Sequence, residues 1–325
     1  MTLTRGSILT QDAFFKSGRI EAHDQAILGF NDGTNGAIQL DGGFTSGDFA
    51  KETFFKFANG VSHRDPNSDD PVADIAHSQD EFVEVKIFRK FGPWRFSLAS
   101  LREAELSEEE FNLRLGQVYQ RQKLRDMFNT AVIAAQAALK NVANLQHDGS
   151  GDAVPTLNHS ALWRGKSKLG DRMESVVFWV MHSVPWGDLN IEGIQSGITN
   201  VSNTIIYGGH PGTLGIPSGI TDAPALFEAG TPNKYWTLGL QAGAVTIRDQ
   251  EGDTVVSDLK TGGENISLRL QGEYSFSVKV MGSKWDTGAG GSNPDDATLG
   301  VAANWLPAAS STKDMAGVAV LSLAQ

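Results

Sequence analysis

The stretch Ser107–Leu145, SEEEFNLRLGQVYQRQKLRDMFNTAVIAAQAALKNVANL, decides the fold of this chain. Apolar side chains recur through it at helical spacing, and no proline follows until Pro155. Ser107 and Glu110 have the spacing of a capping box, and three consecutive glutamates place negative charge where the helix dipole favours it. The pattern predicts one helix of roughly 40 residues, about 60 Å long.

A helix of that length would span the whole molecule. A compact chain of 325 residues has a radius of gyration of about 20 Å and hence a diameter near ~50 Å. We therefore expect an elongated or plate-like subunit built along an uninterrupted helix, a tile and not a self-contained globule. The alternative is a kink near Gly116 or at residues 122–125.

The residues before this helix predict an extended arm, a polar loop and a hairpin. Residues 1–36 are weakly patterned, with one short helix expected near Gln11–Lys16. Residues 37–80 alternate aromatic and turn-forming stretches, and His63–Pro71 (HRDPNSDDP) is the strongest loop signal. We expect a hairpin that turns at Phe91-Gly92-Pro93, because apolar residues alternate with polar ones on both sides. These apolar residues are Val83, Val85, Ile87, Phe91, Trp94 and Phe96.

The residues after the helix predict a second helix and several strands. Asn158–His182 reads as helical, with Asp171 and Glu174 at capping spacing and an apolar, deeply buried run at Val176–Met181. A short helix is expected within Asn293–Trp305. Strands are expected at Thr204–Tyr207, Leu238–Ile247, Ile266–Leu270, Tyr274–Met281 and Val318–Leu323.

Composition excludes several classes of protein. The chain has no cysteine, so disulfides and thiolate metal sites are impossible, and we expect it to function in a cytosol. No apolar run is long enough to cross a membrane, and no signal-peptide pattern opens the sequence. A net charge of −11 argues against a protein that grips nucleic acid through phosphates, but it suits a container that encloses DNA.

The search for chemistry finds no nucleotide-binding, metalloprotease or hydrolase motif. His182 and Ser183 with Asp171 could form a triad, but simple packing is the better interpretation. Four aspartates at 65–74 could bind a cation, but they lack the spacing of a calcium loop, and a solvated loop is favoured. The dispersed tryptophans could stack on sugars, though core and interface anchors are favoured. We predict no enzyme, cofactor or metal.

The order of these elements resembles the tailed-bacteriophage major capsid proteins of the Hong Kong 97-type fold. Three stretches carry the resemblance from about Asp70 onward. They are KLGDRMESVVFWVMHSVPWGDL at Lys168–Leu189, LGIPSGITDAPAL with KYWTLGLQAGAV within Leu214–Val245, and KVMGSKWDTGAGGSNPDDATLGVAANW at Lys279–Trp305. The fold class this implies is α+β, with an N-terminal arm, an extended loop, a spine helix, a peripheral domain and an axial domain.

The resemblance also implies a domain division and an assembly. The arm would be residues 1–36, the extended loop with its hairpin 37–100, and the peripheral domain with the spine helix 101–190. Residues 191–264 would form the axial domain, and 265–325 the return strand and C-terminal segment. The hairpin would lie at an inter-subunit contact formed by Val83, Val85, Ile87, Phe91, Gly92, Pro93, Trp94 and Phe96.

Family members form hexamers and pentamers that tile an icosahedral shell around double-stranded DNA, without sequence-specific binding. The implied location is the virion capsid, assembled in the host cytoplasm, with portal, scaffolding and decoration proteins as further partners and no membrane contact. Within the same architecture, an encapsulin-type shell is the alternative. A carbohydrate-binding or tail module would explain the glycines and tryptophans, but not the long central helix.

Overall fold

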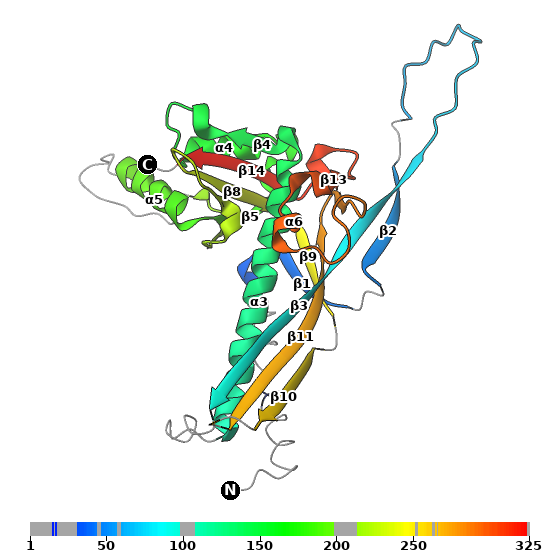
Figure 1. Cartoon of the computed structure of the whole chain (residues 1–325). Helices are drawn as coiled ribbons and strands as arrows, with labels where there is room; N and C mark the ends of the chain where they lie inside the picture. The colour runs from blue at the N-terminus through cyan, green and yellow to red at the C-terminus, as the bar shows by residue number, and fades with distance from the viewer. Residues whose placement is uncertain are drawn as a thin grey trace.

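In the computed structural model, helix α3 (Glu108–Lys140) runs along most of an elongated subunit (Figure 1). The structure describes residues 15, 17, 31–43, 47–56, 60–97, 108–197, 213–250, 253–261, 264 and 266–323. The predicted unbroken helix is confirmed over 33 residues, about 50 Å of rise. It is followed by a 3₁₀ turn at Ala143–Leu145, and the predicted cap Ser107 lies outside the described residues.

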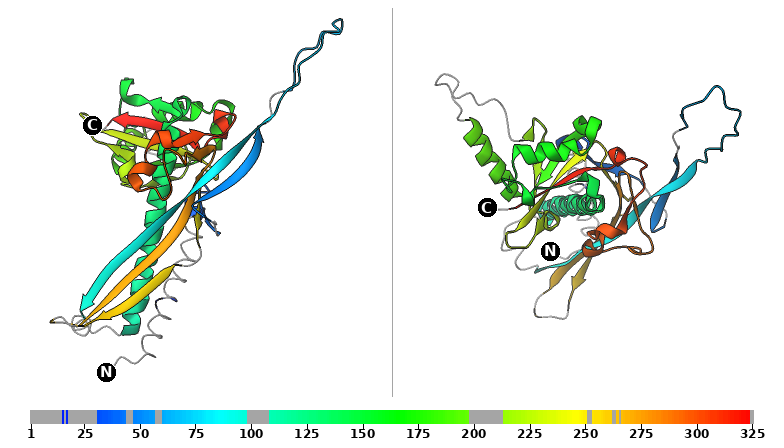
Figure 2. Two further views of the ribbon diagram at one scale, coloured as in Figure 1. Left: turned by 45° about the vertical axis from the view of Figure 1, so that its right-hand side comes forward. Right: turned by 90° about the horizontal axis from the view of Figure 1, so that it is seen from above.

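A long six-stranded sheet, which we call the long sheet, lies alongside α3 (Figures 1 and 2). Its strand order is β1-β9-β11-β3-β2, and β10 pairs with β11. Its strands are β1 (Ile38–Gly42), β2 (Phe49–Lys56), β3 (Ser78–Ser97), β9 (Val245–Asp249), β10 (Thr254–Lys260) and β11 (Ser267–Val280).

The predicted turn at Gly92-Pro93 is wrong, because both residues lie inside the single 20-residue strand β3. Phe91 pairs with Gly272 and Trp94 with Leu270, so two residues of β3 oppose only Gln271 of β11. This is a β-bulge, and its extra position has no ladder partner, which suits a proline that lacks an N–H. The hairpin instead forms between the antiparallel strands β2 and β3, which residues 57–77 connect.

A second six-stranded sheet, the compact sheet, closes over one end of α3 (Figure 1). Its strand order is β4-β14-β8-β5-β6, and β7 pairs with β8. Its strands are β4 (Gln146–Asp148), β5 (Val176–Met181), β6 (Ser218–Ile220), β7 (Phe227–Glu228), β8 (Lys234–Gln241) and β14 (Gly317–Leu323).

The helices around the compact sheet differ from those predicted. Helix α4 (His159–Ser167) begins after Asn158 as expected, but the apolar run at residues 176–181 is strand β5. Its burial was predicted correctly, whereas its type was wrong, because periodicity cannot separate a short buried strand from a helix. Strand β5 is six residues long and contains three valines, which favour a strand. Helix α5 (Ser183–Gly197) lies beyond the stretch that was predicted to be helical.

The remaining elements are short. Strands β12 (Ser283–Trp285) and β13 (Trp305–Pro307) pair with each other, and α6 (Asp296–Leu299) is capped by Asp295. Further 3₁₀ turns lie at Gly149–Gly151, Gly170–Ser175, Pro224–Leu226, Ala302–Asn304 and Thr312–Asp314. The segment expected within Asn293–Trp305 is thus α-helical over only four residues, followed by a 3₁₀ turn.

The other predicted strands are confirmed only in part. The last one is confirmed by β14, while the stretch 238–247 is split between β8 and β9. The two strands expected at 266–270 and 274–281 are one strand, β11. The strand expected at 204–207 lies outside the described residues, as does most of the helix near Gln11.

Sheet pairing crosses two of the expected domain boundaries. Strands β5 and β8 are hydrogen-bonded neighbours, although a boundary after residue 190 would separate them. Likewise β10 and β11 pair along their length, although a boundary after residue 264 lies between them. Each sheet thus joins strands that are far apart in the sequence, and the domain division itself remains a prediction.

The main core lies between α3 and the two sheets. No residue from Met127 to Lys140 is exposed, and the alanines of this half of α3 let neighbouring strands approach closely. A second, smaller cluster holds the other half of the helix against the long sheet. It consists of the buried residues Phe15, Phe91, Leu115, Tyr119 and Leu270.

Candidate assembly surface

The most exposed part of the described chain is the connection between β2 and β3. We call its described residues, 60–77, the extended loop, and every one of them is exposed. Val61 and Val72 are 87% and 89% exposed, unusually high for valines. The hydrogen bonds of its aspartates are local, from the Asn67 amide to Asp65 and from Ser68 to Asp70, each 2.9 Å. The loop projects far from the body of the subunit (Figures 1 and 2).

Charged and aromatic contacts fix the base of this loop. The Asp80 carboxylate accepts hydrogen bonds from Lys56 and Lys284, each at 2.6 Å. Partial burial works to raise the pKa of Asp80, but the two lysines hold it far below its usual range. The rings of Phe54 and Phe82 stack across the two strands, 4.3 Å between centroids. The loop is therefore carried on a well-defined two-stranded stem.

The eight residues expected at an inter-subunit contact lie along β3. Val83, Val85, Ile87 and Phe91 are buried within the subunit's own core. Gly92, Trp94 and Phe96 are half-buried, and Phe96 meets Phe111 of α3 edge-on at 5.1 Å. Pro93 alone of the eight is exposed. These residues are thus brought together mainly against the spine helix, and their role toward a neighbouring subunit remains a prediction.

A buried ion-pair network joins the first half of α3 to the long sheet. The Lys123 ammonium, 3% exposed, lies 2.7 Å from Asp249 and 2.9 Å from Asp253. Asp253 also accepts a hydrogen bond from the Tyr119 hydroxyl at 3.0 Å. Sequence reasoning missed this network, although one signal was available. Lys123 lies four residues from both Tyr119 and Met127, on the face of the helix that is otherwise apolar.

Asp126 extends this network further along α3. It accepts a hydrogen bond from the Tyr274 hydroxyl at 2.9 Å and pairs with Arg89 at 3.3 Å. Burial, together with the negative charge of Asp126, raises the pKa of Tyr274. Arg89 also pairs with Asp296 at the start of α6, so one arginine links β3, α3 and α6. These ion pairs and this hydrogen bond thus hold β3, β11, α3 and α6 together.

The opposite face of the same half of α3 is exposed and basic. Arg114, Val118, Arg121 and Arg125 follow one another at spacings of four, three and four residues, which places them on one face. We call these four residues the arginine stripe. Arg114 pairs with Glu110 at 2.6 Å, whereas no described carboxylate forms an ion pair with Arg121 or Arg125. Sequence reasoning missed this stripe too, although its spacing is readable in the predicted helix.

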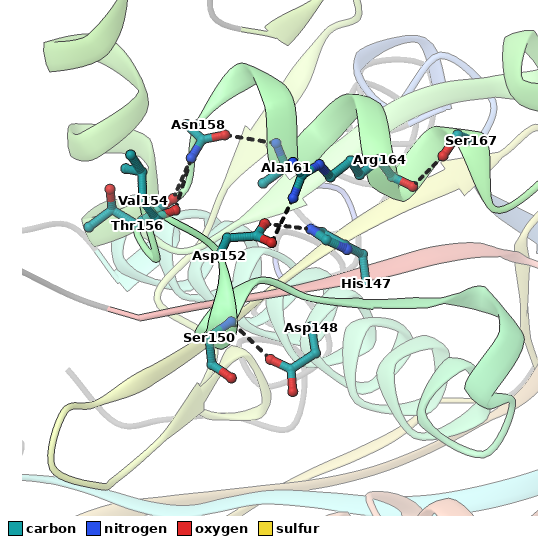
Figure 3. Close-up of polar contacts among 10 residues, drawn as sticks. All are labelled: His147, Asp148, Ser150, Asp152, Val154, Thr156, Asn158, Ala161, Arg164 and Ser167. Carbon is teal, nitrogen blue, oxygen red and sulfur yellow. Dashed lines mark hydrogen bonds and ion pairs between the residues drawn. The ribbon is translucent and has the colours of Figure 1, made fainter.

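A cleft of about 420 Å³ lies between α4 and α5. Beside it, Asn158 caps α4 by accepting from the Ala161 amide at 2.8 Å, and Asp152 lies between Arg164 and His147, at 2.6 and 3.0 Å (Figure 3). Burial raises the pKa of Asp188 on the α5 side. The groups in Figure 3 are engaged in capping and ion pairs, which is a structural role.

The triad considered from the sequence does not assemble. Asp171 pairs with Lys313, while His182 lies 3.5 Å from Asp222 and 3.3 Å from the Ser183 hydroxyl. Among the described residues no group of three or more His, Asp or Glu is arranged to hold a metal ion. In that same part of the chain, no helix is long and apolar enough to span a membrane.

Comparison with known families identifies the chain. The family model described as major capsid protein 13-like matches residues 8–319, nearly the whole sequence. The chain belongs to this major capsid protein family. A comparison with curated proteins gives no significant match.

Solved structures place the fold of this major capsid protein among phage shells. It resembles the capsid subunit of cyanophage Pam1 with a TM-score of 0.51 at 11% identity, covering 86% of each chain. It resembles the acid-stable capsid of Helicobacter pylori bacteriophage KHP30 with a TM-score of 0.51 at 8% identity, covering 88% of each. At such identities the likeness concerns the fold alone, a mixed helix and sheet subunit similar to those of phage capsids.

The membership gives the surface features a common context. A major capsid protein self-assembles into a shell and is located in the virion capsid, so its extended loop and arginine stripe are surfaces of a subunit that has neighbours. In the capsid protein, Lys123 and half of the eight β3 residues are buried within the subunit. The extended loop and the arginine stripe are exposed on the surface of the subunit.

Proposed function

We propose that this capsid protein has the Hong Kong 97-type fold and forms hexamers and pentamers that tile an icosahedral shell around double-stranded DNA. One observation carries the proposal. A 33-residue spine helix and a long exposed loop occur together in a chain of a major capsid protein family. The spine supplies a stiff plate and the loop supplies reach toward a neighbour, which are what a tile requires.

We infer a domain division that follows the sheets. The peripheral domain comprises α3 with β3, β9, β10 and β11, and the axial domain comprises the compact sheet with α4 and α5. The extended loop is then the connection between β2 and β3. The segment before Asn31 remains assigned to an N-terminal arm on the resemblance alone.

The net charge of the chain and the repetition of contacts around rings support the proposed partners. A chain of net charge −11 offers a wall to which packaged DNA does not adhere tightly, which suits filling by a motor. Contacts that repeat around rings make modest pairwise energies strong through multivalency. We further infer portal, scaffolding and decoration proteins as partners, assembly in the host cytoplasm, and a structural and not a catalytic role.

Deletion of Ser68–Ala73 tests the proposal. These residues lie in the exposed loop and outside the core, so the subunit should keep its circular dichroism spectrum and melting temperature. Sedimentation velocity and negative-stain microscopy should show closed shells for the natural chain and mostly free subunits for the variant. Replacement of the same six residues by glycine and serine is the matched control, because it keeps loop length and removes loop chemistry.

Two outcomes would count against this function. A natural chain that stays monomeric at high concentration would contradict a shell subunit. Shells that hold protein cargo and no DNA would favour the encapsulin alternative. Substitution of Gly92, by contrast, is no test of assembly, because a Cβ there would lie 2.7 Å from the Leu270 carbonyl oxygen and would disturb β3 itself.

A further inference from the structure

Lys123 combines a nucleophilic side chain with nearly complete burial. Its side chain is 3% exposed, and the carboxylates beside it, Asp249 and Asp253, are 13% and 7% exposed. Most lysines bury only their aliphatic stem and keep the ammonium group in water. Here the amine itself lies between α3 and the long sheet, where little water reaches it.

The Lys123 amine contacts two carboxyl groups from different parts of the long sheet. Asp249 is the last residue of β9, and Asp253 directly precedes β10 (Figure 1). The Lys123 Nζ lies 2.7 Å from one oxygen of Asp249, and 3.0 and 2.9 Å from the two oxygens of Asp253. An amine this close to both oxygens of a carboxyl group is also within about 3.5 Å of the carbon between them, which is a near-attack separation.

The contacts of the two carboxyl groups give each of them a different role. The Tyr119 hydroxyl donates a hydrogen bond to Asp253 Oδ2 at 3.0 Å. A donor in this position stabilises the negative charge that develops on the oxygen when a nucleophile attacks the carboxyl carbon. The nearest oxygen of Asp249 is close enough to the amine to take a proton from it and to pass that proton on.

Aromatic rings surround this group of residues. The Lys123 Nζ lies 5.5 Å from the centre of the Tyr274 ring, and Tyr274 meets Tyr119 edge-on with 6.2 Å between centroids. Phe91 packs on Tyr119 with 4.4 Å between ring centroids. Apolar surroundings penalise charged groups relative to neutral ones, so they favour transfer of a proton from an ammonium group to a neighbouring carboxylate. That transfer produces a neutral amine beside a neutral carboxylic acid.

We propose that Lys123 and Asp253 condense to an isopeptide bond inside the folded subunit. The Lys123 ammonium gives one proton to Asp253, and the neutral amine attacks the carboxyl carbon, so that a C–N bond forms. Asp249 carries a proton from the nitrogen to the leaving hydroxyl, the C–O bond breaks, and one water departs. One ammonium and one carboxylate thus give one amide and one water, and Asp249 is again a carboxylate. The step requires no oxidant, reductant or further reactant.

The bond joins two elements of one and the same subunit. It ties the first half of α3 to the segment between β9 and β10, and no neighbouring copy takes part. The fold supplies the catalysis, because it holds the reacting groups together in a site from which water is excluded. The reaction occurs once in each chain and acts on no outside molecule, so it is compatible with a structural role.

The intact mass of the denatured full chain tests the proposal. The natural chain, folded and then denatured for mass spectrometry, should be lighter by one water than its sequence predicts. Digestion should release one branched peptide that contains both Lys123 and Asp253. Lys123→Arg is the matched control, because arginine keeps the positive charge but is not a nucleophilic amine. This variant should have the full mass that its sequence predicts.

The rate at which the lighter species appears after refolding tests the two supporting roles. Asp249→Asn removes the proton carrier, and Tyr119→Phe removes the hydroxyl donor while it keeps the ring. Each change should slow the loss of water by about a hundredfold or more. Circular dichroism of each refolded variant shows that the comparison is made between folded chains.

Two results would overturn the proposal. A natural chain that keeps its full mass, both as a free subunit and in assembled particles, would leave Lys123 as the centre of an ion pair and nothing more. Loss of ammonia from the Asp249→Asn variant would place the bond on residue 249 and not on Asp253. The mass of the natural chain decides the main question even where a variant fails to fold. Neither result bears on the proposed shell function, because the reaction is confined to one subunit.

Discussion

The two halves of α3 are one continuous helix, yet they are stabilised in different ways. From Met127 to Lys140 no residue is exposed, and the helix is surrounded by the core of both sheets. From Glu110 to Asp126 one face packs on the long sheet through aromatic rings and the Lys123 network, while the other face is exposed. We call residues 127–140 the embedded half, and residues 110–126 the one-sided half because only one of its faces is buried. The difference indicates that hydrophobic burial anchors the helix at one end and leaves one face exposed at the other.

The largest effect is expected in the one-sided half. Lys123→Ala should reduce the free energy of unfolding by about 3–5 kcal/mol, because it leaves Asp249 and Asp253 buried without their cation. Chemical denaturation of the full chain measures the loss. Adding Asp253→Asn should recover part of it. A loss below about 1 kcal/mol would show that the network is solvated and that aromatic packing alone holds this half.

A smaller loss is expected in the embedded half. Leu139→Ala should cost about 3 kcal/mol, because the side chain has no exposed surface and its removal leaves a cavity. Val118→Ala is the matched control on the exposed face, and it should change stability by no more than about 0.5 kcal/mol. Equal losses in the two variants would remove the distinction between the halves.

The smallest effect concerns the ion pair at the embedded end. Glu228 receives hydrogen bonds from Lys140 and Trp236, and although partial burial opposes them, they lower its pKa. The pair is partly exposed to solvent, so Glu228→Gln should cost only about 0.5 kcal/mol at neutral pH. A lowered folded-state pKa stabilises above the ordinary value of 4.5, and this contribution falls away as pH drops below it. The melting temperatures of the natural chain and the variant should therefore converge in acid.

Parts of this architecture could be predicted because their signals are local. The spine helix has an apolar repeat and an acidic first turn, and His63–Pro71 has a turn-rich composition. The type of Val176–Met181 was predicted wrongly, because periodicity alone does not separate a short buried strand from a buried helix, although the length of the run and its valines favour a strand. The turn expected at Gly92-Pro93 failed for a different reason. A bulge needs a partner strand, and β11 is about 180 residues further along the chain.

The sequence alone could predict only part of the candidate assembly surface. The acidic loop was visible as composition, but the exposure of the arginine stripe depends on knowing which helical face the sheet covers. Lys123, on the buried face of the helix, illustrates the same limit of prediction from sequence. A lysine at an apolar position is informative only once the aspartates of β9 and the segment before β10 are known to reach it.

The continuity of β3 has a mechanical consequence. Its 20 residues form a ribbon about 65 Å long, from the stem of the extended loop toward the first turn of α3. Antiparallel hydrogen bonds to β2 and β11 run across that ribbon. A pull along its length therefore loads many of these bonds in shear at the same time and does not unzip them one after another. The pairing of β3 with its two neighbours should accordingly resist a pull along the strand.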